Sequence, residues 1–141
     1  MFPINSWLIY TLLALFLYGL WGFFSKLATN YVDPKSALIY EVLGALIVGL
    51  VLFSNNGFRV RIDNLGVFYA IGVGVFGTLA TFFFFIAITK GSISIILPLT
   101  SLYPIVTILL SVFLLKESLS LKQSIGILLA LVAIVLCSMT D

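Results

Sequence analysis

Two long uncharged segments separated by a short polar loop constrain this chain more than any other feature. Residues 91–115 and residues 123–140 contain no charged side chain, and the loop between them reads KESLSLK. Since about 20 apolar residues cross the roughly 30 Å hydrocarbon core of a bilayer, the two segments predict a transmembrane helical hairpin. Pro98 and Pro104 lie inside the first segment. They predict a kinked helix of the kind that transporters place near the bilayer midplane.

The composition indicates a membrane protein. Hydrophobic residues make up 62% of the 141 residues and charged residues 9%, whereas about a quarter of the residues in soluble proteins are charged. A single domain of this size cannot hide so much apolar surface from water, so we expect an integral membrane protein. The first 25 residues contain no lysine or arginine, and their apolar run is too long for a signal peptide. We therefore expect a retained first span.

The residues that are rare or missing disfavour several function classes. The chain has no histidine and one cysteine, Cys137, so we expect no internal disulfide, no metal site and no cofactor. A net charge of +2 is too small to indicate a nucleic-acid partner. With one carboxylate at membrane depth, no acid–base pair can be assembled there, and we do not expect an enzyme.

Charged residues divide the chain into five predicted transmembrane helices within one domain, residues 1–141. The predicted helices cover residues 6–25, 35–53, 65–88, 93–115 and 121–138. Asp33 followed by Pro34 is a start signal for the second helix, and Ser120 with Gln123 has capping-box spacing before the fifth. The predicted fold class is an all-α integral membrane protein, a five-transmembrane-helix bundle.

An odd number of spans predicts that the two termini lie on opposite sides of the membrane. Loop lysines and arginines, which set the orientation, number four on the side of the N-terminus and three on the other side. The four are Arg59, Arg61, Lys116 and Lys122, and the three are Lys26, Lys35 and Lys90. Two interpretations stay open: one orientation decided by the first helix, or dual topology with insertion in both orientations.

Small residues recur at helical spacing on three predicted helices and indicate faces where helices pack closely. These faces carry Ala37, Glu41, Ala45 and Gly49 on the second helix, Ala70, Gly74, Gly77 and Thr81 on the third, and Gly126, Ala130, Ala133 and Cys137 on the fifth. Close packing is the favoured interpretation for the third and fifth helices. Gly126, Ala130 and Ala133 are the predicted dimer-packing residues.

Glu41 is the only Asp, Glu, Lys or Arg residue well inside a predicted span. A carboxylate at this depth is costly and usually functional, which makes Glu41 a candidate for ion or proton coupling. The alternative is that Glu41 reaches nearby headgroups or pairs with Lys26 or Lys35. The run Phe82–Phe85 covers every helical face, so part of it must meet lipid, and Phe85 is taken as a lipid-facing position.

Aromatic and hydroxyl side chains form a candidate substrate-binding site on the first and fourth predicted helices. Its residues are Tyr18 and Trp21 on the first helix and Thr100, Tyr103 and Thr107 on the fourth. Pro104 leaves the Thr100 carbonyl without its usual helical donor, and Tyr103 is too central for an interfacial anchor. For the fourth helix, two interpretations stay open: its polar residues line a ligand-binding cavity, or they pack against other helices with their hydroxyl groups bonded to their own helix.

The order of these motifs resembles the EamA domain of the drug/metabolite transporter superfamily. The proline-bearing segment followed by LLKESLSLKQSIGILLALVAIVL is similar to the family's fourth helix, short loop and fifth helix, and LYGLWGFFSKLA supports the match. The resemblance implies one five-helix repeat of a transporter for amino acids, nucleosides, sugars or drug-like amines. The four-helix small multidrug resistance relatives use a glutamate in the first helix, which is absent here, so their proton-coupled mechanism is not carried over.

Many family members carry two such repeats that are inverted relative to each other, whereas this sequence contains one. A lone repeat can recover that arrangement by pairing with an oppositely inserted copy. The resemblance implies an antiparallel homodimer that works by alternating access in a prokaryotic cell (inner) membrane, with lipids and a small organic substrate as partners. Two alternatives stay open: a subunit paired with a related five-helix protein, and a non-transporting assembly or anchoring protein.

Overall fold

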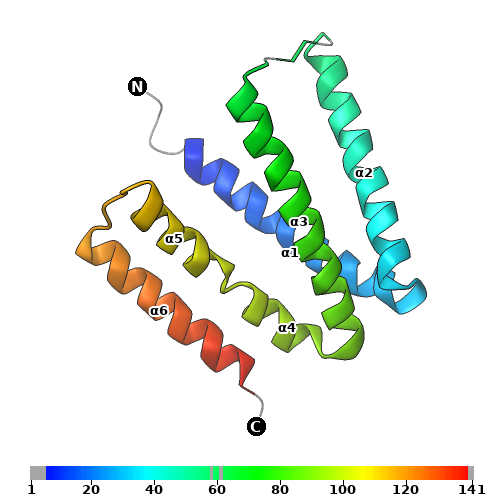
Figure 1. Ribbon diagram of the computed structural model, residues 1–141. Helices are drawn as coiled ribbons and strands as arrows, with labels where there is room; N and C mark the ends of the chain where they lie inside the picture. The colour runs from blue at the N-terminus through cyan, green and yellow to red at the C-terminus, as the bar shows by residue number, and fades with distance from the viewer. Residues whose placement is uncertain (1–5, 58, 61, 140–141) are drawn as a thin grey trace. The chain divides into compact units, whose positions relative to one another are not determined.

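The computed structural model describes residues 6–57, 59–60 and 62–139. Within these residues it contains six helices (Figure 1): α1 (Ser6–Tyr31), α2 (Pro34–Asn55), α3 (Asn64–Lys90), α4 (Ile93–Thr100), α5 (Tyr103–Leu114) and α6 (Leu121–Ser138). The predicted all-α fold class is confirmed. Arg61 and the side chain of Cys137, which the sequence analysis used, lie outside the described part.

Four segments of the described chain are long and apolar enough to cross a membrane. They are Trp7–Tyr31, Pro34–Asn55, Asn64–Lys90 and Ile93–Leu114. The apolar part of α6, Leu121–Leu136, is shorter and measures about 24 Å at 1.5 Å per residue. The chain is therefore a multi-pass membrane protein, while a fifth span and the placing of the termini on opposite sides stay predictions.

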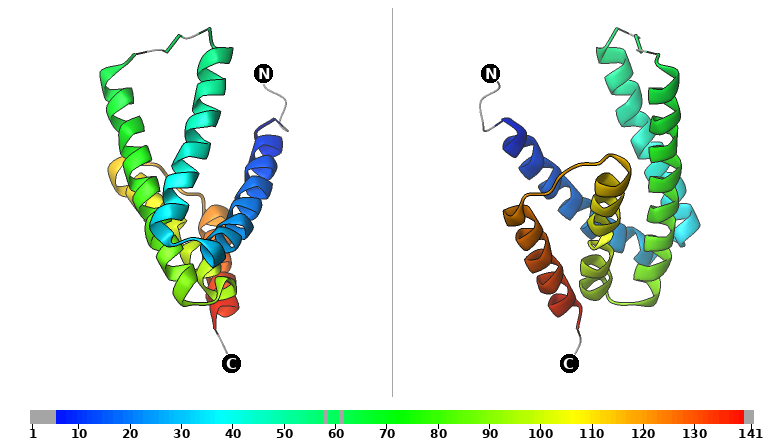
Figure 2. Two further views of the ribbon diagram at one scale, coloured as in Figure 1. Left: turned by 90° about the vertical axis from the view of Figure 1, so that its right-hand side faces the viewer. Right: turned by 60° about the vertical axis from the view of Figure 1, so that its left-hand side comes forward.

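The chain forms two compact units, Met1–Thr89 and Lys90–Asp141. In the first unit, the end of α1, the start of α2 and the end of α3 converge, and the three helices splay apart toward their other ends (Figure 2). We call this convergent end the vertex. It consists of Trp21, Ser25, Ala37, Glu41, Phe84, Phe85 and Ile88, five of which are buried (Ser25, Ala37, Phe84, Phe85 and Ile88). In the second unit, α4 packs against α6.

Capping residues start α2 and α6 where the sequence predicts. Asp33 Oδ1 accepts the backbone N–H of Ser36 at 2.9 Å, and Asp33 Oδ2 accepts the Ser36 hydroxyl at 3.0 Å. These two hydrogen bonds, helped by the positive charge of Lys35, hold the pKa of Asp33 below its ordinary value of 3.8. Ser120 and Gln123 form the predicted capping box, in which the side chain of each bonds the backbone of the other.

The first helix is longer than predicted, because it continues past Ser25 to Tyr31. Lys26 was expected to mark the end of the span. Instead its ammonium group donates a hydrogen bond of 2.7 Å to the Ile88 carbonyl, near the end of α3. A charged side chain that finds a partner on a neighbouring helix does not end its own helix.

The predicted helix over residues 93–115 is interrupted. It ends at Thr100, passes through a turn at Ser101 and Leu102, and begins again at Tyr103. Pro104 lies in the first turn of α5, where its missing N–H costs nothing. Across the break, no backbone N–H of the described residues donates to the Thr100 carbonyl. The chain thus turns at the position where Pro104 removes the donor that a continuous helix would use.

Candidate functional site

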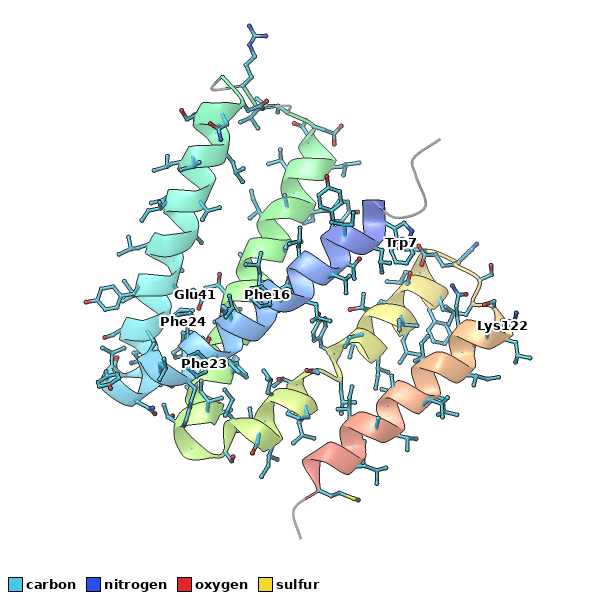
Figure 3. All side chains as sticks on the ribbon, turned by 180° about the vertical axis from the view of Figure 1, so that it is seen from behind. Trp7, Phe16, Phe23, Phe24, Glu41 and Lys122 are labelled. Atoms are coloured by element: carbon cyan, nitrogen blue, oxygen red, sulfur yellow. The ribbon has the colours of Figure 1, made fainter. Side chains whose placement is uncertain are left out.

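The vertex positions the membrane-depth carboxylate of Glu41. Figure 3 shows this side chain on the half of α2 that lies toward the vertex. Glu41 Oε1 accepts a hydrogen bond of 3.1 Å from the indole Nε1 of Trp21 on α1. Glu41 Oε2 is buried and has no hydrogen-bond partner among the described residues. The carboxylate therefore points into the helix cluster and has one oxygen satisfied and one unsatisfied.

An aromatic contact holds Trp21 in place beside the carboxylate. The indole stacks on Phe84 of α3, with ring centroids 5.1 Å apart and an interplanar angle of 25°. Phe84 and Phe85 are 6% and 3% exposed, whereas Phe83 is 65% exposed. The expectation that part of the run Phe82–Phe85 meets lipid agrees with the exposure of Phe83. The choice of Phe85 as a lipid-facing position is wrong, because its ring lies in the vertex.

The two lysines near the vertex do not pair with Glu41. Lys26 binds the Ile88 carbonyl, and Lys35 is exposed at the start of α2. Within the described residues, no lysine or arginine forms an ion pair with Glu41. The buried hydroxyl of Ser25 is also committed, because it donates to the Trp21 carbonyl at 2.6 Å. The predicted alternative of a Glu41 pair with Lys26 or Lys35 is therefore not found.

The predicted substrate-binding residues differ in their surroundings. Trp21 belongs to the vertex, whereas Tyr18 and Tyr103 are 70% and 68% exposed. Thr107 is exposed. The Thr100 hydroxyl donates to the Leu97 carbonyl at 2.9 Å, as expected for a threonine that bonds to its own helix. A cavity that joins the residues of the first helix to those of the broken span stays a prediction.

The predicted small-residue faces are mostly uncovered. A Cβ built at Gly74, Gly77 or Gly126 would meet no heavy atom within 4 Å among the described residues. Ala130 and Ala133 are exposed as well. The close packing predicted for the third helix is absent at Gly74 and Gly77, the two glycines of the predicted face. The role of Gly126, Ala130 and Ala133 in dimer packing stays a prediction.

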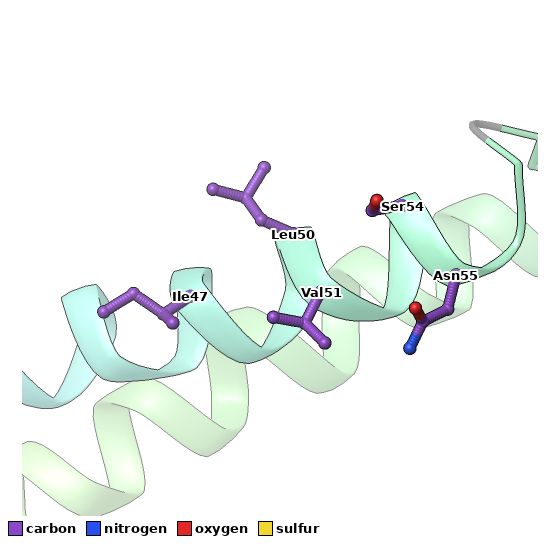
Figure 4. A pocket seen from close by; sticks show the side chains of 5 residues that line it. All are labelled: Ile47, Leu50, Val51, Ser54 and Asn55. Atoms are coloured by element: carbon purple, nitrogen blue, oxygen red, sulfur yellow. The ribbon is translucent and has the colours of Figure 1, made fainter.

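Two surface hollows lie near α2, and neither contains a predicted substrate-binding residue. The one in Figure 4 has a volume of about 330 Å³ and is lined by Ile47, Leu50, Val51, Ser54 and Asn55, all from α2. The other has a volume of about 360 Å³ and is lined by Asp33, Pro34, Lys35, Phe82 and Ile86. A hollow lined by one helix offers few convergent polar groups, which ligand sites usually need. In the described part of the chain, no three His, Cys, Asp or Glu residues form a group that could hold a metal ion.

The pairing of Trp21 with Glu41 was not predicted. From the sequence, Trp21 is predicted in a substrate cavity, and lysines are the predicted partners of Glu41. One sequence feature does point to the pairing: each residue shares a helical face with small residues. These are Gly22 and Ser25 beside Trp21, and Ala37 and Ala45 beside Glu41. Such faces let helices approach closely.

Comparisons with known proteins agree with this fold. The EamA-like transporter family matches residues 5–139. An uncharacterized protein of Methanocaldococcus jannaschii is 30% identical over 130 residues, which cover 92% of this chain and 94% of the relative. An uncharacterized transporter from each of two Helicobacter pylori strains is 30% identical over 128 residues. That match covers 90% of this chain and 43% of each relative, so the chain spans less than half the length of these transporters.

No solved structure matches the chain at a significant level. The family match covers almost the whole sequence, and the four long apolar segments agree with the membrane-spanning helices that the resemblance implies. The chain belongs to the EamA-like transporter family.

Proposed function

We propose that the chain is a secondary transporter that moves small organic molecules across a membrane by alternating access. The interrupted span carries the proposal: α4 and α5 are separated by a turn, and the Thr100 carbonyl accepts no backbone N–H across it among the described residues. An anchoring helix needs no such break, whereas transporters use the free backbone groups of discontinuous helices to bind their substrates. Family membership, and relatives named as transporters, support the same function.

The proposed substrate cavity lies near the membrane midplane. Its residues are Tyr18, Trp21, Thr100, Tyr103 and Thr107. At Thr100 the carbonyl oxygen accepts no backbone N–H of the described residues, and the hydroxyl, which donates its proton to Leu97, can act only as an acceptor. The exposed rings of Tyr18 and Tyr103 suit the apolar part of a small amphipathic solute, whose polar part would hydrogen-bond to the Thr100 carbonyl.

The proposed working form is an antiparallel homodimer. Gly126 leaves open space on α6, beside exposed Ala130 and Ala133, so a helix of a second copy could approach closely. The four-to-three distribution of loop lysines and arginines gives little preference for one orientation. The Helicobacter pylori relatives are more than twice as long as the matched segment, which leaves room for a second repeat in the same chain.

Transport is tested by screening purified protein for ligands and then measuring their uptake into liposomes. A ligand that binds the folded protein raises its apparent melting temperature, and we expect at least one hit among amino acids, nucleosides, sugars and amines. Tyr103→Ala should abolish binding of the hit with near-normal stability, whereas Phe83→Ala, at a similarly exposed ring, should bind normally. Loss of stability with unchanged affinity in Tyr103→Ala would remove α5 from the cavity.

The orientation is tested by labelling one loop cysteine from each side of the membrane. Asn56→Cys follows α2 and is introduced together with Cys137→Ser, so that only one thiol remains. A membrane-impermeant maleimide should label about half of the protein in intact cells and all of it after lysis. Labelling of all or none of it in intact cells would show a single orientation. Co-purification of another five-helix protein would then favour the heteromeric subunit.

A further inference from the structure

The vertex contains one buried polar atom that the fold leaves without a partner. Glu41 Oε1 is bonded to Trp21, whereas Oε2 is buried and has no hydrogen-bond partner among the described residues. An ionised carboxylate that is buried without a counter-charge is costly, and inside a membrane such groups usually bind an ion or a proton. The vertex therefore requires a positive charge from outside the helices, or a proton that neutralises the carboxyl.

None of the three helices at the vertex supplies that positive charge. On α1, Lys26 is bonded to the Ile88 carbonyl. On α2 and α3, Lys35 and Lys90 are exposed near the helix ends. Tyr18, three residues before Trp21, and Tyr40, directly before Glu41, are 70% and 65% exposed. No ion pair neutralises Glu41 within the described residues, so the buried carboxylate has no counter-charge from the chain there.

The groups around Glu41 select the kind of cation. A hard metal ion takes about six oxygen ligands, whereas the vertex residues other than Glu41 and Ser25 have aromatic or aliphatic side chains. What remains beside the carboxylate is the indole of Trp21, stacked on Phe84. A carboxylate next to aromatic rings suits an organic ammonium ion, which combines a charge-assisted hydrogen bond with a cation–π contact.

We infer that the Glu41 carboxyl is an exchange site that holds either a proton or the ammonium group of an organic amine. When an ammonium ion arrives, the O–H bond at Oε2 breaks and the proton leaves to water. An N–H donor of the ammonium then bonds the carboxylate, so one amine cation enters for each proton released and the charge of the site is unchanged. This inference rests on the proposed transport function, because it names the class of substrate.

Trp21 is the positioning residue of this site. Its indole N–H occupies Oε1, and its stacking on Phe84 fixes the ring, which leaves Oε2 as the oxygen that takes the proton or the amine. Trp21→Phe keeps an aromatic ring but removes the N–H. We expect this variant to bind an amine about tenfold more weakly and to shift the pH profile of binding, because the loss of a hydrogen bond to a charged group costs about that factor.

The test is proton release from the purified full chain in weakly buffered detergent solution. Phenethylammonium chloride should release up to one proton per chain, whereas its neutral analogue 2-phenylethanol and sodium chloride should release none. Glu41→Gln keeps an acceptor for Trp21 and should lose the release, whereas the matched control Glu117→Gln in the loop after α5 should keep it. Unchanged release in Glu41→Gln, or equal release by sodium chloride, would overturn the inference.

If the Glu41→Gln variant fails to fold, a second measurement on the unmodified chain tests the same inference. A hydrophobic carbodiimide reacts with protonated carboxyls, and mass spectrometry locates the modified residue. Phenethylammonium should protect Glu41 and 2-phenylethanol should not; equal protection by both overturns the inference.

Failure of this site is distinguishable from failure of the proposed function. Normal uptake of a panel solute by Glu41→Gln overturns the site alone. Amine binding with proton release but no uptake overturns transport alone.

Discussion

The vertex of the first unit and the proline break of the second unit satisfy their polar groups in opposite ways. At the vertex, partners come from helices far apart in sequence, as in the bonds from Trp21 to Glu41 and from Lys26 to Ile88. Around the break, hydroxyl groups bond locally, and both Thr100 and Ser101 donate to the Leu97 carbonyl. The structure describes no buried residue in α4 or α5.

The first unit therefore depends more on tertiary packing than the segment around the break does. Burial and interhelical bonds raise the cost of local opening, whereas exposed segments with local bonds open more easily. We therefore expect the vertex to stay fixed and the break to change conformation during transport. Each of the following substitutions tests one side of that comparison.

Phe84→Ala is expected to have the largest effect on stability, a loss of about 3 kcal/mol, because truncation of a buried aromatic ring leaves a cavity. Phe84 is 6% exposed and stacks on Trp21. The neighbouring substitution Phe83→Ala, at a ring that is 65% exposed, is the matched control and should change stability little. The measurement is the free energy of unfolding in detergent. Equal losses in the two variants would show that the vertex is not a packed core.

Pro104→Ala is expected to join α4 and α5. Alanine restores an N–H that can donate to the Thr100 carbonyl, and one added backbone bond should slow amide exchange at Ser101 and Leu102 about tenfold. Uptake should fall at the same time. Pro34→Ala is the control, because Pro34 lies in the first turn of α2, where an added N–H finds no helical acceptor. Normal uptake with a joined helix would show that transport does not need the break.

Ser120→Ala is expected to cost about 1 kcal/mol by removing the capping box at the start of α6. Ser120 and Gln123 bond each other's backbones, so the loss should appear as faster amide exchange in the first turn of that helix. Ser118→Ala in the preceding loop is the control and should leave exchange unchanged. An unchanged first turn in Ser120→Ala would mean that the cap does not hold the start of α6.

Asp33→Asn is expected to have the smallest effect, confined to acidic solution. Hydrogen bonds from Ser36 lower the pKa of the folded Asp33, so its contribution is full above the unfolded value of 3.8 and is lost as the pH falls through the folded value. Asparagine keeps the cap without the charge. Below pH 3.8 the melting temperature of the original protein should fall toward that of Asp33→Asn. Parallel curves at all pH values would contradict a role for the charge.

The elements of the fold could be predicted because local chemistry decides them. The caps at Asp33 and Ser120 and the apolar length between charged residues give the helices, and Pro104 gives the break, whereas Pro98 lies inside the continuous helix α4. The end of α1 was missed, because Lys26 looks like the end of a span when its partner at Ile88 is unknown.

The candidate site could be predicted only in part. The sequence singled out Glu41 by its depth and Trp21 by its face, but it could not pair them. Residues 20 positions apart on different helices meet only through the packing of those helices, and no local pattern encodes that distance. For the same reason, the four phenylalanines at 82–85 could not be divided into lipid-facing and buried rings until the position of Trp21 was known.

Hydrogen exchange in lipid nanodiscs tests the contrast between a fixed vertex and a movable break most directly. The compared amides are those of Phe84–Ile88, in the buried end of α3, and those of Thr100–Tyr103, around the break. We expect the amides at the break to exchange roughly 100-fold faster, because exposed segments open at a lower free-energy cost than buried helix ends. Equal rates, or slower exchange at the break, would contradict a movable break and with it the proposed mechanism of alternating access.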